Sequence, residues 1–244
     1  MTGGKRLSPC TRAFIKYSIC SVRVSTMNVD KMEAFAALDH YGIHVARSKY
    51  VDSAEDAVAF AERRNAPDPR FVPIVLRVAD AAEQTPLKSI EAVREAYEAI
   101  RRRTAEPILA QVFTGPGTDI VIFGKTDESL GKTIGVHSAT HSVQRTVPLG
   151  PESARELASE YEGYGQHGSR ESARRMLEHL LVRISDLFAD TELRELRVDA
   201  RLHENEYTVL DASMSSLKAL HIKPRLDKRA HDRKGDEYRP AGRQ

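Results

Sequence analysis

Two acidic residues in the last quarter of the sequence have the type and spacing that could hold a metal ion. Asp199 and Asp211 lie twelve residues apart on predicted neighbouring strands, so both carboxylates could face one cleft. Mg²⁺ takes hard oxygen donors, commonly one or two protein carboxylates completed by phosphate and water. The alternative is that both residues are strand-end acids in turns. The spacing alone leaves both interpretations open.

The other residue types that often carry chemistry give weaker signals. His137 and His141 have the i, i+4 spacing of a metal pair, but no Glu follows His137 as in a metalloprotease helix, so both are predicted to be surface histidines. The two cysteines, Cys10 and Cys20, form neither a disulfide framework nor a zinc spacing, which favours a reduced compartment. Neither lies beside a plausible base, and no nucleophile elbow is present, so catalytic residues stay unknown.

The charge is unevenly distributed along the 244 residues. Residues 1–26 carry five Lys/Arg and no acid, and residues 218–244 carry nine Lys/Arg against four acids, which leaves a net charge of −8 for residues 27–217. Nucleic-acid binding by this core is not expected, because such affinity rests mainly on cations that meet phosphates. A nucleic-acid binder that uses its tails is a remaining alternative. No apolar run approaches the roughly 20 residues of a membrane-spanning helix, so no membrane partner is expected.

Both tails are predicted to be disordered. Residues 1–26 are rich in Arg, Ser and Thr, as mitochondrial transit peptides are, but they could also be an extension upstream of a true start at Met27, or a functional arm. The run from Lys218 to the end has few large apolar residues. The expected location is cytoplasmic, or the mitochondrial matrix if residues 1–26 are a transit peptide.

Helical and strand patterns alternate between the tails, which predicts an α/β (α+β) fold. Helices are expected after caps at Asn28 or Asp30, at Ser53 and at Ser89, and with Pro151 as a first residue. The strongest helical pattern covers residues 172–189. Strands are predicted at residues 71–78, 108–113, 120–123, 132–136, 193–202 and 207–211.

The order of short phrases along the chain points to a family. The phrases are residues 38–45 (LDHYGIHV), 53–58 (SAEDAV), 73–78 (PIVLRV), 91–97 (EAVREAY), 108–111 (ILAQ), 117–124 (GTDIVIFG), 193–199 (LRELRVD) and 209–212 (VLDA). In this order they resemble the ATP-grasp domain, the beta subunit, of ADP-forming acetyl-CoA and succinyl-CoA synthetases. The resemblance spans about residues 38–214.

The resemblance implies a two-lobed ATP-grasp-like domain, with an N-terminal lobe at 27–110 and a C-terminal lobe at 111–217. In this family ATP or ADP lies between the lobes, a cation holds the phosphates, and Mg²⁺ bridges phosphate oxygens to protein ligands. Arg77 occupies the place of the strand Lys that reaches phosphate, although an edge-strand Arg in water is the alternative. Gln111 and Asp119 match the hinge and the acid after the Gly-Pro-Gly turn, which makes them cofactor-binding candidates. Asp199 and Asp211 match the metal-binding positions.

The chain departs from the family at both glycine-rich loops. Where the family has a histidine and a glycine pair, residues 79–88 read ADAAEQTPLK, with no His and no Gly. The second glycine-rich loop is replaced by residues 135–142. Asp119 is one methylene shorter than the family Glu, and Val112 replaces a family Glu. Without glycine, backbone N–H groups cannot easily curl around a phosphate.

Two functions follow from the resemblance and its departures. The first is a nucleotide-binding subunit similar to ADP-forming acyl-CoA synthetase, weakened or inactive alone, which pairs with a CoA-binding synthetase subunit. The second is a non-catalytic interaction or regulatory protein that keeps the ATP-grasp fold. The missing glycine-rich loops argue against catalysis and so favour the second function. The two aspartates argue for nucleotide binding and so favour the first. A shared fold alone does not decide between them.

Overall fold

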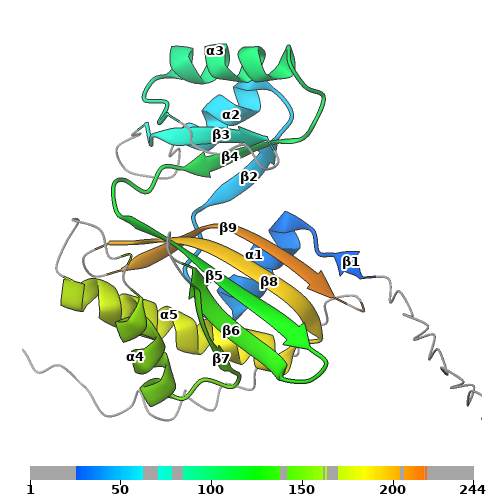
Figure 1. The fold of residues 1–244 in the computed structure, drawn as a ribbon. Coiled ribbons are helices and arrows are strands. Elements are labelled where there is room, and N and C mark those ends of the chain that lie inside the picture. The colour runs from blue at the N-terminus through cyan, green and yellow to red at the C-terminus, as the bar shows by residue number, and fades with distance from the viewer. Residues whose placement is uncertain are drawn as a thin grey trace, which may run out of the picture.

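The computed structural model describes residues 26–62, 71–78, 85–137, 142–161, 163, 170–203, 206–216 and 218. These residues form two lobes joined by a narrow neck (Figure 1). Residues 1–25, His141 and residues 219–244 lie outside the described residues, so the predictions made for both tails and for that histidine remain predictions. No helix in the described part of the chain combines the length and apolar character needed to cross a bilayer.

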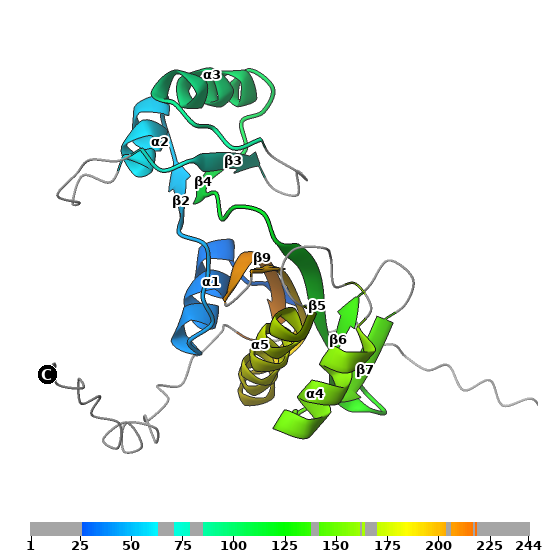
Figure 2. The same ribbon diagram turned by 90° about the vertical axis from the view of Figure 1, so that its left-hand side faces the viewer.

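The large lobe is built on an antiparallel sheet of six strands in the order β1-β9-β8-β5-β6-β7. Its strands are β1 (Met27–Asn28), β5 (Thr118–Asp127), β6 (Gly131–His137), β7 (Ser142–Thr146), β8 (Leu193–Leu202) and β9 (Tyr207–Ser216). Helices α1 (Lys31–His40), α4 (Pro151–Glu160) and α5 (Arg170–Asp190) pack on one face, where the main hydrophobic core lies (Figure 2).

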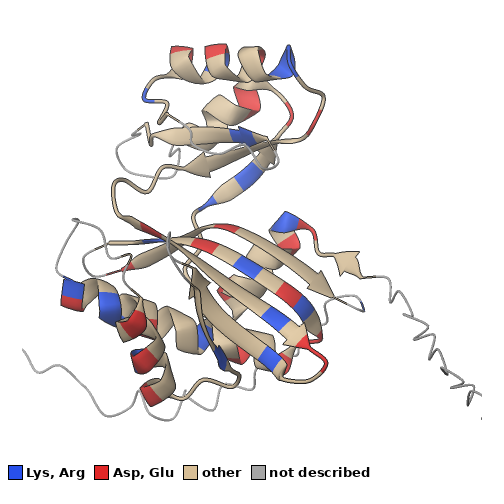
Figure 3. Cartoon of the chain, in the orientation of Figure 1, with Lys and Arg blue, Asp and Glu red and all other residues tan. Residues whose placement is uncertain are grey.

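The opposite face of this sheet, called here the outer face, carries charged side chains. Along β8, Leu196, Val198 and Ala200 are buried toward the helices, and the residues that alternate with them are more exposed. This period of two is expected for a strand with one face on a core and one face toward solvent. Bands of Lys/Arg and Asp/Glu accordingly follow β5 and β8 (Figure 3).

The small lobe is a sheet of three antiparallel strands in the order β2-β4-β3, covered by two helices. The strands are β2 (Ser48–Val51), β3 (Ile74–Val78) and β4 (Ile108–Val112), and the helices are α2 (Ala54–Ala61) and α3 (Ile90–Arg101). A second, separate core includes Phe60, Ile74, Val93 and Ile108. The helices begin where their caps predict, because the Ser53 and Ser89 hydroxyls accept hydrogen bonds from the backbone N–H groups of Asp56 and Ala92.

The boundary between the lobes differs from the expected division at residue 110. The first segment, residues 27–46, belongs to the large lobe: β1 pairs with β9, and Phe35 and Leu38 of α1 are buried in the large-lobe core. Asp30 caps α1 by accepting from the N–H of Met32 and Glu33. The expected N-terminal lobe of 27–110 is therefore wrong at its start, because the apolar side of α1 finds its packing partners on α5 and β9.

The chain crosses between the lobes twice, and the two crossings are bonded to each other. It leaves the large lobe after Ala46, whose N–H donates to the carbonyl of Val209 at 2.8 Å, and it returns after β4. At the neck, the N–H of Val112 donates to the carbonyl of Arg47 at 2.9 Å. The small lobe is therefore an insertion between α1 and β5.

Candidate nucleotide-binding cleft

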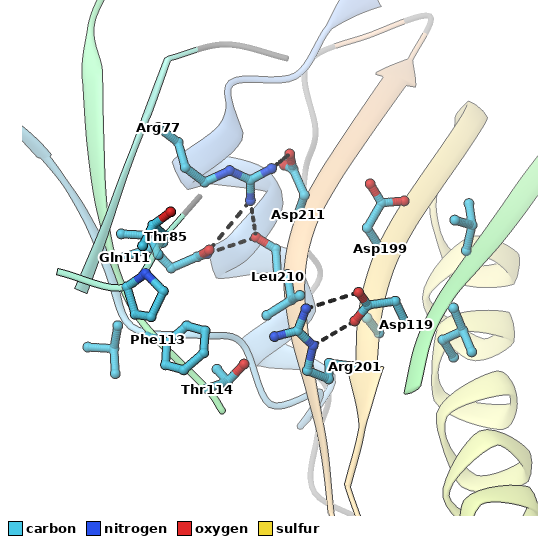
Figure 4. Close-up of a pocket in the computed structure, with 16 residues that line it drawn as sticks. Arg77, Thr85, Gln111, Phe113, Thr114, Asp119, Asp199, Arg201, Leu210 and Asp211 are labelled. Atoms are coloured by element: carbon cyan, nitrogen blue, oxygen red, sulfur yellow. Dashed lines mark hydrogen bonds and ion pairs between the residues drawn. The ribbon is translucent and has the colours of Figure 1, made fainter. Parts of the chain in front are cut away.

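A cleft of about 810 Å³ lies where the two lobes face each other. Its charged and amide side chains come from β3 and β4 on the small lobe and from β5, β8 and β9 on the large lobe (Figure 4). All five residues predicted to bind nucleotide or metal line it: Arg77, Gln111, Asp119, Asp199 and Asp211. The structure thus brings together residues that are up to 134 positions apart in the sequence.

Arg77 and Asp211 form an ion pair across the cleft. The Arg77 Nη2 donates to Oδ2 of Asp211 at 2.9 Å, and its Nη1 donates to the carbonyl of Leu210 at 3.0 Å. Both side chains are mostly buried, 18% and 17% exposed. The alternative of an edge-strand Arg in water is therefore wrong, although β3 is an edge strand.

A second cation reaches Asp211 from α1. The Nζ of Lys31 lies 3.0 Å from Oδ1 of Asp211, and the same oxygen accepts the N–H of Ala212 at 2.8 Å. Both oxygens of this carboxylate are therefore engaged in the structure. Lys31 is a site residue that sequence reasoning missed, because 180 positions separate it from its partner.

Gln111 joins the lobes at the end of β4. It is 3% exposed, and its amide Nε2 donates to the Ser48 hydroxyl at 3.0 Å and to the carbonyl of Leu210 at 2.8 Å. Its Oε1 also accepts a long hydrogen bond, 3.4 Å, from Arg77. The prediction placed this residue at the hinge, and it does lie beside the neck.

Asp199 faces Asp211 directly across the sheet. The two are register partners on β8 and β9, at a point where the ladder shifts register. Asp199 is held by Arg197, whose Nε lies 3.0 Å from Oδ1, and this pair is more exposed than that of Asp211. Both residues lie inside strands, so the interpretation as strand-end acids in turns is wrong.

Asp119 lies on β5 and pairs with Arg201 of β8. The guanidinium makes two bonds to this carboxylate, at 2.6 Å and 2.9 Å, and a third to the carbonyl of Gly115 at 2.8 Å. The hydrogen bonds that Arg201 donates to Asp119 raise the pKa of Arg201 above its ordinary value, so this cation stays charged. Arg201 was not predicted, yet the phrase RVDAR has charged residues at every second position, which in a strand places Arg197, Asp199 and Arg201 on one face.

The two opposed aspartates fit a magnesium ion that arrives with a nucleotide. They supply hard oxygen donors at one point of the cleft, and Mg²⁺ is commonly bound by one or two carboxylates together with phosphate oxygens and water. No group of three or more His, Cys, Asp or Glu that could hold a metal occurs among the residues described. His137 ends β6 and is exposed, as expected.

A family comparison identifies the fold. The model of the ATP-grasp domain family matches residues 22–215. The chain belongs to the ATP-grasp family. Its two-lobed α/β architecture, with antiparallel sheets facing a cleft, is that of the ATP-grasp fold, as the sequence predicted. No curated protein matches the chain.

Solved structures agree with the family. The dinucleotide-forming acetyl-coenzyme A synthetase 1 of Ca. Korarchaeum cryptofilum has a TM-score of 0.63 and 24% identity, over 78% of this chain and 92% of that one. The same enzyme with coenzyme A and Mg-AMPPCP has a TM-score of 0.62 and 21% identity, over 78% and 92%. A Pyrococcus horikoshii protein has a TM-score of 0.63 and 18% identity, over 80% and 92%. The predicted resemblance to the ATP-grasp domain of ADP-forming acetyl-CoA synthetases is thus confirmed at the level of the fold.

Proposed function

We propose that this ATP-grasp chain binds Mg²⁺ with ATP or ADP in the cleft between its lobes, as the nucleotide-binding subunit of an ADP-forming acid–CoA ligase. The reaction would be acid + CoA + ATP ⇌ acyl-CoA + ADP + phosphate. The observation that carries the proposal is the cross-cleft cluster of Arg77 on one lobe and the opposed Asp199 and Asp211 on the other. A phosphate-binding cation and two oxygen ligands therefore converge in one cleft of a nucleotide-binding fold.

The chain's own residues would bind and orient the phosphates. Arg77 would exchange Asp211 for phosphate oxygens, since a guanidinium donates as well to phosphate as to carboxylate. This exchange would free Oδ2 of Asp211, and within the described residues Asp199 has only the exposed Arg197 to release. When bound, magnesium would offset the phosphate charge, and Asp199 and Asp211 would hold it. Gln111 would fix the distance between the lobes at the hinge end.

A CoA-binding synthetase subunit is the partner that this function requires. The roles proposed here for the cleft residues concern nucleotide and metal alone, and none of them has a proposed role with CoA or an acyl group. The Ca. Korarchaeum cryptofilum enzyme with a similar fold has been solved with coenzyme A bound. We therefore place CoA chemistry on a second chain and expect the isolated subunit to be weak or inactive as a ligase.

The second candidate function is a non-catalytic interaction or regulatory protein that keeps the fold. One structural observation favours it: Arg77 and Asp211, the residues that should meet phosphate and metal, satisfy each other. The sequence of residues 79–88, without glycine or histidine, points the same way. Nucleotide binding separates this candidate from the first.

The deciding experiment is a calorimetric titration of ATP and ADP onto the purified chain, with and without Mg²⁺. We expect magnesium-dependent binding that is lost in the Asp199→Ala/Asp211→Ala double variant. Asp39→Asn, which removes an exposed carboxylate of α1 outside the cleft, is the matched control and should bind normally. Binding that survives the double substitution would sink the proposed site, and no binding at millimolar nucleotide would leave the non-catalytic candidate.

A further inference from the structure

The guanidinium of Arg77, which is proposed to bind phosphate, is already occupied by the protein. Its Nη2 donates to Oδ2 of Asp211 at 2.9 Å, and its Nη1 donates to the carbonyl of Leu210 at 3.0 Å and to Oε1 of Gln111 at 3.4 Å (Figure 4). The side chain is also mostly buried. A phosphate group that reaches Arg77 must therefore compete with groups that are already in place.

Asp211 is the charged group among these three partners. The oxygens of Leu210 and Gln111 are neutral, whereas the Asp211 carboxylate carries a negative charge 2.9 Å from the Arg77 guanidinium. Lys31 shares this carboxylate, with its Nζ 3.0 Å from Oδ1 and 3.2 Å from Oδ2, so it offsets part of the charge without displacing Arg77. Without a metal, Asp211 therefore both occupies Arg77 and repels an incoming phosphate.

The same carboxylate is a proposed ligand of magnesium, and this second partner would reverse its effect. A divalent cation is the largest local charge in a site, so a carboxylate that holds one attracts a guanidinium less strongly. Arg77 would then be released toward phosphate oxygens, to which it can donate charge-assisted hydrogen bonds of the same kind. Asp199 differs from Asp211 in this respect, because its partner Arg197 is mostly exposed and has no proposed role with phosphate.

We propose that Asp211 is an internal competitor that keeps Arg77 from phosphate until Mg²⁺ is present, so that the cleft selects the magnesium complex of a nucleotide over the metal-free anion. The inference rests on the proposed function and adds to it the regulation of that site. Asp211 has two opposite effects on nucleotide affinity. It weakens the binding of metal-free nucleotide, and it strengthens the binding of the magnesium complex.

The test compares the affinity of the full chain for ADP in excess EDTA and in excess Mg²⁺, by calorimetry at constant ionic strength. Asp211→Asn keeps the shape of the side chain and removes its charge. We expect this variant to bind metal-free ADP about tenfold tighter than the unmodified chain and to bind Mg²⁺·ADP about tenfold more weakly, both within the usual range of coupling between sites.

Two further variants separate the release of Arg77 from a general change of charge. Asp199→Asn removes a carboxylate of the same site without releasing Arg77. It should weaken Mg²⁺·ADP binding, but its gain for metal-free ADP should stay under about threefold, the size of an exposed charge effect. The Arg77→Gln/Asp211→Asn double variant should lose the metal-free gain of Asp211→Asn, because the released cation is no longer there.

A measurement on Arg77 alone keeps the inference testable if Asp211→Asn does not fold. Because Arg77 and the metal compete for the same carboxylate, Arg77→Gln should bind Mn²⁺ in the absence of nucleotide about threefold tighter or more, within the range of coupling between sites. Carboxylates are suitable ligands for Mn²⁺ as they are for Mg²⁺, and electron paramagnetic resonance counts the free Mn²⁺ ion. Thermal melting checks that each variant folds. An Mn²⁺ affinity that Arg77→Gln does not raise would refute the competition.

The remaining outcomes distinguish failure of this inference from failure of the proposed function. The competition is refuted, and the proposed function stands, if the unmodified chain binds Mg²⁺·ADP but Asp211→Asn binds metal-free ADP no tighter than Asp199→Asn does. A metal-free gain that persists in the double variant would assign the effect to Lys31 and refute the role given to Arg77. Absence of Mg²⁺·ADP binding to the unmodified chain would overturn both the proposed function and this inference.

Discussion

Asp199 and Asp211 are register partners on adjacent strands, and each carboxylate is held by a cation from a different place. Asp211 is bound by Arg77 of the other lobe and by Lys31 of α1, whereas Asp199 is bound by Arg197 of its own strand. Like charges directly opposite each other destabilise a sheet, so these cations stabilise the large lobe as it stands. The same arrangement makes the two aspartates unequal in their contribution to stability.

Replacing Asp211 should therefore cost more stability than replacing Asp199. Asp211→Asn removes the carboxylate that Arg77 and Lys31 share, both mostly buried, and should lower the free energy of unfolding by about 1–3 kcal/mol. Asp199→Asn breaks a more exposed pair and should cost under about 1 kcal/mol. Urea unfolding at pH 7 measures both. Equal losses would show that the cross-lobe pair is no stronger than a surface pair.

The turn between β5 and β6 should contain a strongly acidic carboxyl. Oδ1 of Asp127 accepts hydrogen bonds from the hydroxyl and N–H of Ser129 and from the N–H of Leu130, which lower the pKa of Asp127 from 3.8 to about 2. Because the folded pKa lies below the unfolded one, the stabilisation is complete above pH 3.8 and is lost as the pH falls through about 2. Carboxyl NMR titration should give the low value, and Ser129→Ala should raise it. An ordinary pKa in the unmodified chain contradicts the geometry of the turn.

Truncation should show that the two tails are dispensable for folding and that α1 is not. A chain of residues 27–217 keeps both lobes and should melt as cooperatively as the full protein. A chain of residues 43–217 loses β1 and α1, and with them the buried Phe35 and Leu38, so it should lose cooperative melting or express as aggregates. Calorimetry on the two fragments makes the comparison. Cooperative melting of the shorter one would mean that α1 is not an integral part of the large-lobe core.

The isolated chain should not become phosphorylated on histidine and should show little or no acyl-CoA synthetase activity. The segment from Val78 to Lys88 contains no histidine to accept a phosphoryl group and no glycine to help surround it. Loss of even one preorganised donor to a transition state typically costs roughly 3 kcal/mol. Incubation with labelled ATP and Mg²⁺, alone and with a co-purifying CoA-binding chain, tests this. Acid-labile label on His137 or His141 would mean that the phosphorylated site has moved.

Local signals predicted the elements, and non-local contacts decided their assembly. The caps at Asp30, Ser53 and Ser89 begin helices as predicted, because a cap is a contact between residues two or three apart. The strands β1, β2 and β7 were not predicted, since they have two, four and five residues and little apolar pattern. The strand expected at residues 120–123 runs from Thr118 to Asp127, because pairing with β6 and β8 extends it.

The candidate site also consists of residues that the sequence predicted and residues that it did not. Resemblance to a family selected Arg77, Gln111, Asp119, Asp199 and Asp211, and the structure places all of them around one cleft. The family resemblance did not predict Lys31, Arg197 or Arg201. These residues form ion pairs with the three aspartates of the site. Those pairings depend on strand register and on the packing of α1 in the large lobe. The roles of the five residues in binding nucleotide and metal remain predictions.

The hydrogen bond between Arg47 and Val112 holds the first and last residues of the small lobe side by side, so this lobe is an inserted unit whose two ends meet. The small lobe can therefore be deleted from the gene, because a short linker would be enough to join residue 46 to residue 113. The large lobe would then retain all six strands and its three helices in one uninterrupted run. In the intact protein this bond at the neck acts together with the bonds that Arg77 and Gln111 make to Asp211 and Leu210, so the small lobe is attached to the large lobe at its two chain crossings and at the cleft.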